Sequence, residues 1–174
     1  MINSLSRRLA VGIKNIVPES PQSVEVLKYS LSFVLNFVFV VVLSLLISIF
    51  TGHVYDAVIA MVSYAILRQV SGGYHLKSGM LCVVVSAAGI TAISLADFSD
   101  RVTIWATIGA LILCAIFSPQ MKNHTRIPGR YYPLLKVISV LMVATNFLFN
   151  SPVIAAAFFV QGLTLISGKG VKRE

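Results

Sequence analysis

Two side chains that can carry out covalent chemistry lie close together in an otherwise apolar sequence. His75 and Cys82 are seven positions apart, and the cysteine lies at the start of a hydrophobic run. A thiol reacts as its thiolate, which forms more readily at a helix N-terminus or beside an imidazole. An imidazole can take the proton of the thiol or pair with the thiolate. The two residues therefore indicate a cysteine nucleophile with a histidine base.

Glycines near the histidine decide whether these two side chains can meet. On a continuous helix, seven residues would separate His75 from Cys82 by about 10 Å, which is too far for a hydrogen bond. Three glycines flank the histidine and permit backbone angles that other residues avoid: Gly72, Gly73 and Gly79. The sequence therefore predicts that residues 71–78 are not helical and fold His75 back toward Cys82.

Each candidate also has a purely structural interpretation. Cys82 could be a small apolar residue packed within a helix, and His75 a loop histidine at the lipid headgroups. Arg68 could pair with a substrate carboxylate or a developing oxyanion, or it could anchor a helix end. Cys114 has no titratable residue near it, so packing is expected there. No acid is placed to complete a triad, which leaves Ser71, Ser78 or a backbone carbonyl to orient the imidazole.

The composition identifies the class of protein. Of 174 residues, 57% are hydrophobic and 11% are charged, and the mean hydropathy is +0.87. Soluble chains carry about 25% charged residues. The chain is therefore predicted to be an all-α, polytopic integral membrane protein with one membrane domain over residues 1–174. Its net charge of +8 comes from short breaks between apolar runs, so no nucleic-acid partner is expected. The cysteines lack metal-ligand spacing, and no cofactor is expected.

About six apolar runs are candidates to cross about 30 Å of hydrocarbon. They cover residues 29–50, 54–67, 79–96, 102–118, 134–149 and 153–167. The run 54–67 is short, and it could be re-entrant. Residues 1–17 have apolar and basic residues at helical spacing, which is typical of an interfacial amphipathic helix. Residues 168–174 form a basic tail.

The basic residues predict the orientation. With six crossings and a cytoplasmic N-terminus, thirteen Lys and Arg residues fall on the cytoplasmic side and only Arg101 falls outside. This bias follows the positive-inside rule. It predicts that both termini and the stretch 68–82 face the cytoplasm.

The pattern R-x3-GG-x-H-x6-C resembles the accessory gene regulator B (AgrB) family, the membrane cysteine endopeptidases of Gram-positive quorum sensing. Its residues here are Arg68, Gly72, Gly73, His75 and Cys82. The resemblance implies that Cys82 is the nucleophile and His75 its base, and that Arg68 and the two glycines shape the site.

The resemblance also implies a substrate, a small propeptide of the AgrD type. Its C-terminal part would be removed, and the remainder would be held as a thioester until it cyclises to a thiolactone or lactone. Three basic residues of the loop after residue 118 would attract the acidic tail of the propeptide: Lys122, Arg126 and Arg130. The alternative is that these residues only anchor the inner loop. Membrane lipids and a second copy in a homodimer are the other implied partners.

Three other functions compete with this hypothesis. A small peptide exporter would not need Cys82. A different membrane thiol enzyme, such as an acyltransferase, would use the same dyad and leave peptides uncut. A structural subunit would have no use for the Gly-Gly-x-His break.

Overall fold

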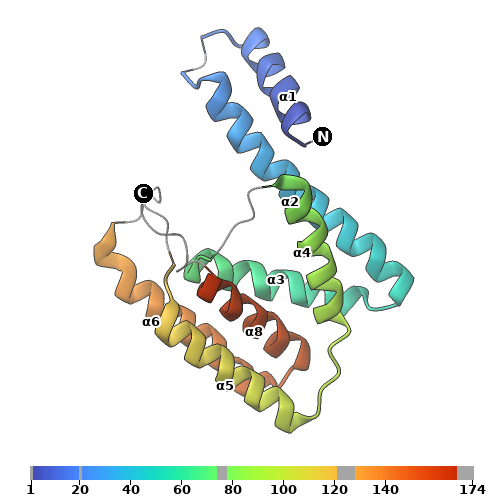
Figure 1. Cartoon of the computed structure of the whole chain (residues 1–174), viewed down its shortest axis with the longest axis vertical. Coiled ribbons are helices and arrows are strands. Elements are labelled where there is room, and N and C mark those ends of the chain that lie inside the picture. Colours follow the sequence, from blue (N-terminus) through green and yellow to red (C-terminus); the bar gives the residue numbers. More distant parts are fainter. Residues whose placement is uncertain (1, 20, 74–77, 121–127, 168–174) are drawn as a thin grey trace.

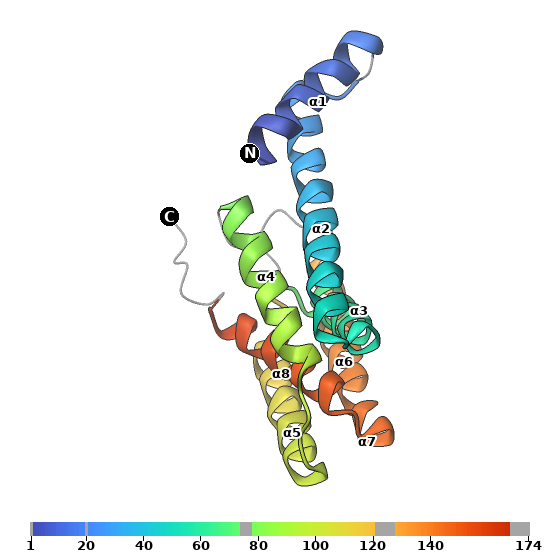
Figure 2. The same cartoon turned by 90° about the vertical axis from the view of Figure 1, so that its right-hand side faces the viewer.

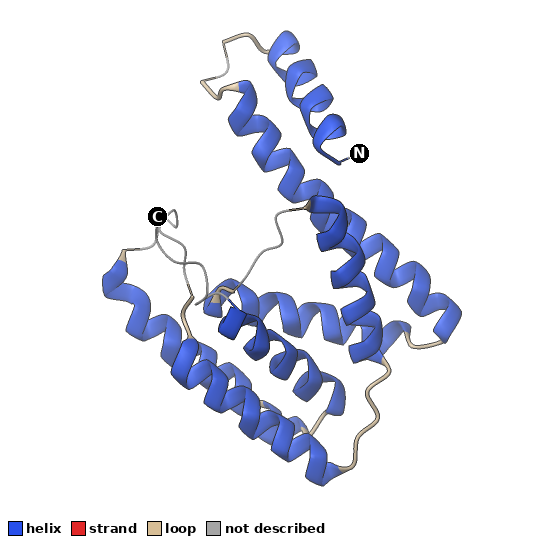
Figure 3. Ribbon diagram, in the orientation of Figure 1, coloured by secondary structure: helices blue, strands red, loops and turns tan. Residues whose placement is uncertain are grey.

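The computed structural model describes residues 2–19, 21–73, 78–120 and 128–167. Helices dominate this part of the chain, and it contains no strand (Figure 3). The all-α fold class predicted from the sequence is confirmed. Each predicted apolar run lies largely within a helix, and the fifth run is divided at Thr145. The elements are α1 Ile2–Ile16, α2 Val24–Thr51, α3 Val54–Ser71, α4 Gly79–Ser94, α5 Asp100–Phe117, η1 Gly129–Tyr131, α6 Tyr132–Ala144, α7 Asn146–Phe149 and α8 Pro152–Ser167.

Helix α8 packs against both α3 and α5, and α6 contacts the same two helices (Figure 1). Two glycines let α5 and α8 approach closely. A Cβ at Gly109 would lie 2.9 Å from the ring of Phe159, and one at Gly162 would lie 3.0 Å from Leu113. Small residues of this kind are typical of helix contacts in membranes. The core of this group is Leu67, Ala110, Cys114, Val143, Phe158 and Leu165.

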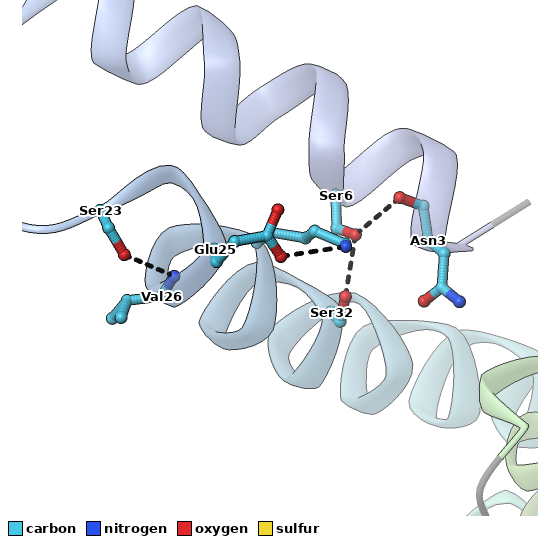
Figure 4. Close-up of polar contacts among 7 residues, drawn as sticks. Asn3, Ser6, Ser23, Glu25, Val26 and Ser32 are labelled. Atoms are coloured by element: carbon cyan, nitrogen blue, oxygen red, sulfur yellow. Dashed lines mark hydrogen bonds and ion pairs between the residues drawn. The ribbon is translucent and has the colours of Figure 1, made fainter.

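Helices α1, α2 and α4 form a second group, which Figure 2 shows from the side. Helix α1 lies along the N-terminal part of α2, with Ile2, Ser6 and Ala10 buried. Ser32 of α2 donates a hydrogen bond to Ser6 Oγ at 2.8 Å (Figure 4). The larger apolar residues of α1 remain exposed and available to a membrane: Leu5, Leu9, Ile13 and Ile16. The interfacial role of residues 1–17 stays a prediction.

Among the described residues, three helical stretches are long and apolar enough to cross a membrane: Val24–Thr51, Asp100–Phe117 and Gly129–Phe149. Gly79–Ser94 and Pro152–Ile166 are shorter apolar helices. The short run at 54–67 extends by four residues at its C-terminal end to become α3, whose 18 residues span about 27 Å. The apolar helices are those of a membrane protein, and six complete crossings stay a prediction.

Candidate active site

Helix α3 ends at two glycines. Gly72 has φ +75° and Gly73 has φ +135°, angles that residues with a Cβ avoid. Ser71 is still part of the helix. Its Oγ donates to the carbonyl of Leu67 at 2.7 Å. The last backbone hydrogen bond of the helix joins Gly72 N–H to the carbonyl of Arg68 at 2.9 Å. The prediction that residues 71–78 are not helical is therefore wrong at Ser71. It is right at Gly72, Gly73 and Ser78, and residues 74–77 lie outside the described part of the chain.

The glycine turn pairs with the segment that follows α5. Gln120 N–H donates to the carbonyl of Ser71 at 2.8 Å, and Gly73 N–H donates to the carbonyl of Gln120 at 3.3 Å. Gly72 and Gln120 thereby form an isolated parallel bridge. A Cβ at Gly72 would overlap the carbonyl of Gln120. Both the backbone angle and this close approach therefore require glycine at position 72.

A buried amide from α8 holds the same turn. Gln161 is fully buried, and its Nε2 donates to Ser71 Oγ at 3.0 Å and to the carbonyl of Gly72 at 2.7 Å. Thr164 Oγ1 lies 2.7 Å from the backbone carbonyl of Gln161 and 3.1 Å from Gln161 Oε1, and its one proton is shared between these two acceptors. The Ser71 hydroxyl donates to Leu67 and accepts from Gln161, so it has one acceptor lone pair left for a further donor such as an imidazole N–H. The sequence hypothesis missed Gln161, although an amide within an apolar run is a signal of a polar contact inside the protein.

Arg68 lies beside this turn. Its Nη1 donates to the Tyr64 hydroxyl at 3.1 Å, and its guanidinium carbon is 5.8 Å from the centre of the Tyr64 ring. A Cβ at Gly73 would be 3.6 Å from the same Nη1. The fold thus brings together Arg68, Gly72 and Gly73, three of the five residues of the pattern.

Cys82 lies in the first turn of α4, as the sequence predicts. Ser78 caps this helix: its Oγ accepts from Leu81 N–H at 3.5 Å, and its carbonyl accepts from Cys82 N–H at 2.9 Å. The thiol is half-buried, with Ser86 Oγ 4.0 Å away. The role of Cys82 as nucleophile stays a prediction.

The described residues do not bring Cys82 into contact with the glycine turn. In Figures 1 and 2 the start of α4 lies apart from the end of α3. His75 lies outside the described residues, so its predicted approach to Cys82 stays a prediction.

A further polar group that the sequence hypothesis missed lies near the start of α4. A Cβ at Gly79 would be 3.3 Å from Asn36 Oδ1 of α2. That oxygen is buried and has no hydrogen-bond partner in the part of the chain that the structure describes. An unpaired buried acceptor costs about 1–3 kcal/mol. Asn36 therefore offers an unused acceptor beside Gly79, one helical turn before Cys82.

The predicted basic cluster is described only in part. Lys122 and Arg126 lie outside the described residues. Arg130, in η1, is exposed, and its guanidinium carbon lies 4.8 Å from the centre of the Tyr131 ring. Cys114 is fully buried in the core, which confirms that it packs. Among the described residues no three His, Cys, Asp or Glu side chains form a group that could hold a metal ion.

These features define a helical membrane protein with a glycine turn clamped between helices and a cysteine at the start of a neighbouring helix. Residues 2–166 match the family model of accessory gene regulator B, and the chain belongs to the AgrB family. It is also similar to an AgrB-like protein of Halalkalibacterium halodurans, 24% identical over 172 residues, which cover 95% of this chain and 87% of that protein. No solved structure matches the chain. Membership of the family places the chain in the processing of accessory gene regulator quorum-sensing peptides.

Replacing Gly72 with alanine tests the turn. Gly72→Ala should destabilise the protein by about 1–3 kcal/mol, because the new Cβ meets the Gln120 carbonyl and φ is strained. Thermal unfolding of the detergent-solubilised protein measures the change. The matched control is Gly89→Ala in α4, where no atom lies within 4 Å of the added Cβ. The control should be neutral or slightly stabilising, and equal losses in both variants would contradict the account.

Replacing Gln161 with leucine tests the clamp, meaning the two hydrogen bonds that Gln161 donates to Ser71 and Gly72. Gln161→Leu leaves the Gly72 carbonyl without its donor at 2.7 Å and should cost about 1–3 kcal/mol in thermal unfolding. Gln69→Leu is the control, since Gln69 is exposed on α3 and has no hydrogen bond from its side chain to a described residue. A Gln161→Leu protein as stable as the Gln69→Leu protein would show that the clamp contributes little.

Proposed function

We propose that this protein is a membrane cysteine endopeptidase that cleaves the C-terminal part of an AgrD-type propeptide. The observation that supports this most is the place of Cys82, half-buried in the first turn of α4 in a chain of the AgrB family. A half-buried thiol at that position has an exposed side from which a peptide can approach.

In the proposed reaction, the Cys82 thiolate attacks the carbonyl carbon of the scissile peptide bond. The proton of the thiol goes to His75, which then gives it to the departing amine as the carbon–nitrogen bond breaks. The products of this step are the free C-terminal fragment and a thioester between Cys82 and the new C-terminus of the propeptide. Charge develops on the carbonyl oxygen, and Arg68 is the candidate to stabilise it.

The thioester preserves a reactive acyl group for ring closure. A thiol or hydroxyl of the bound propeptide attacks the thioester carbonyl, forms a thiolactone or lactone and returns Cys82 as its thiolate. A site closed to bulk water would slow competing hydrolysis.

Substrate binding in this proposal depends on charge and membrane position. Lys122, Arg126 and Arg130 attract the acidic tail of the propeptide from the cytoplasmic side of the cell membrane. The protein is multi-pass, with both termini and the active site on that side, as the distribution of Lys and Arg favours.

Co-expression with a tagged AgrD-type propeptide tests the chemistry. Cys82→Ala should reduce cleavage to about a thousandth of wild type or less, and His75→Ala should reduce it about a hundredfold or more. Cys114→Ala is the matched control, because that thiol is buried in the core, and it should retain cleavage. The release of the C-terminal fragment is read by immunoblot with mass spectrometry.

Cleavage that persists in Cys82→Ala would exclude the proposed nucleophile. Wild-type protein that exports the propeptide but never cuts it would favour a peptide exporter.

Cysteine labelling in intact cells tests the orientation. In a background with Cys82→Ser and Cys114→Ser, Asp97→Cys should react with a membrane-impermeant maleimide, whereas Asn15→Cys should react only after the cells are opened. Both positions are exposed or half-buried in the structure. Labelling of Asn15→Cys in intact cells would overturn the proposed topology.

A further inference from the structure

An open apolar groove of about 600 Å³ lies between α1, α2 and α4. Its lining is almost entirely aliphatic and aromatic, and the one charged residue in it is Arg8. The groove is lined by Ile2, Ser4, Leu5, Arg8, Phe39, Val42, Leu43, Leu46, Met80, Val83 and Val84. The volume lies within the range of small-molecule sites, about 300–1,000 Å³.

The groove is separate from the reactive thiol. Met80, Val83 and Val84 line it from α4, and Cys82 does not. At 100° per residue, Cys82 lies about 160° around the helix from Met80 and Val84. A ligand in the groove would therefore bind on the other flank of α4 from the thiol.

The shape of the groove favours a thin, flexible occupant. Along α2 the lining runs from Phe39 to Leu46, which is about 10 Å. An α-helix with its side chains is about 10–12 Å across. A hydrocarbon chain is much thinner, and each of its buried CH₂ groups contributes about 0.8 kcal/mol.

The positive charge of Arg8 at the groove indicates which headgroup the ligand carries. Arg8 is exposed and makes no hydrogen bond or ion pair with a described residue. Of the two acids nearest to Arg8 in sequence, Glu19 is exposed and forms no ion pair with Arg8, and Glu25 pairs with Lys28 at 3.2 Å, both within the described residues. A guanidinium matches the geometry of a phosphate. No acidic residue lines the groove, so the ammonium of a zwitterionic headgroup would find no partner.

The placement of α1 brings this arginine to the right depth. Its side toward α2 is formed by Ile2, Ser6 and Ala10, while Leu5 and Leu9 remain exposed beside Arg8. A helix with this division lies at the boundary between headgroups and acyl chains. There an arginine reaches headgroup phosphates while its own stem covers apolar surface.

We propose that the α1–α2–α4 groove is a binding site for one anionic phospholipid, with an acyl chain along Phe39, Leu43 and Val83 and the phosphate on Arg8. The bound lipid joins α1 to α4. It thereby stabilises α4, the helix that carries Cys82. The lipid binds on the side of α4 opposite the thiol.

Thermal unfolding of the purified full-length protein in detergent tests this site, with phosphatidylglycerol and phosphatidylcholine of the same acyl composition as probes. Phosphatidylglycerol should raise the Tm of the wild type by about 5–10 °C at a hundredfold excess over its dissociation constant. For Arg8→Gln, about ten times more phosphatidylglycerol should be needed to reach the same rise in Tm. Arg7→Gln is the matched control, since Arg7 is an exposed neighbour that does not line the groove.

A second variant tests the groove itself. Leu43→Trp places a larger side chain among the lining residues and should abolish most of the shift while keeping Arg8. Equal shifts from both lipids in the wild type, equal losses in Arg7→Gln and Arg8→Gln, or a full shift in Leu43→Trp would each overturn the proposal. A Tm that depends on protein concentration and not on lipid would also overturn it, because a second copy would then cover the groove.

Discussion

The structure around the glycine turn depends on one buried amide. Gln161 belongs to α8, ninety residues along the chain from Ser71, yet its Nε2 bonds both the Ser71 hydroxyl and the Gly72 carbonyl. In an apolar interior an unpaired amide or carbonyl is costly, so these groups strongly prefer one another. The neighbouring Gly162 lets Leu113 of α5 pack closely on α8. The position of the turn is thus linked to the packing of α8.

The two parts of the candidate site belong to different helix groups. The turn is fixed among α3, α8 and Gln120, whereas Cys82 lies on α4, which packs most extensively against α2. The sequence limits how far apart they can be. Gly73 and Ser78 are five positions apart in the sequence, so their Cα atoms are at most about 18 Å apart. The short connection keeps the thiol near the turn, and a small shift of α4 relative to α3 would change the distance between them.

The sequence predicted those structural features that depend only on residues close together in the chain. Apolar runs located the helices, and Gly72 and Gly73 located the end of α3, because hydropathy and backbone freedom are properties of short segments. Ser71 was placed outside the helix because the pattern does not show its bond to Leu67. Gln120 and Gln161 were missed since their partners are distant in sequence. The break at Thr145 was missed as well, because a continuous apolar run does not reveal it.

Polar side chains inside the apolar helices differ in whether their hydrogen bonds are satisfied. Asn146 donates to Thr107 Oγ1 at 2.9 Å and accepts from the Ser151 N–H at 3.2 Å, so it holds helix ends together. The Gln161 amide is likewise satisfied. Among the described residues, the Oδ1 of Asn36 and the hydroxyls of Ser44 and Thr103 are buried without a hydrogen-bond partner. The cost at Asn36 is offset only when a donor reaches it, and under the proposed function the backbone N–H groups of a propeptide bound at Cys82 would be donors of the required kind.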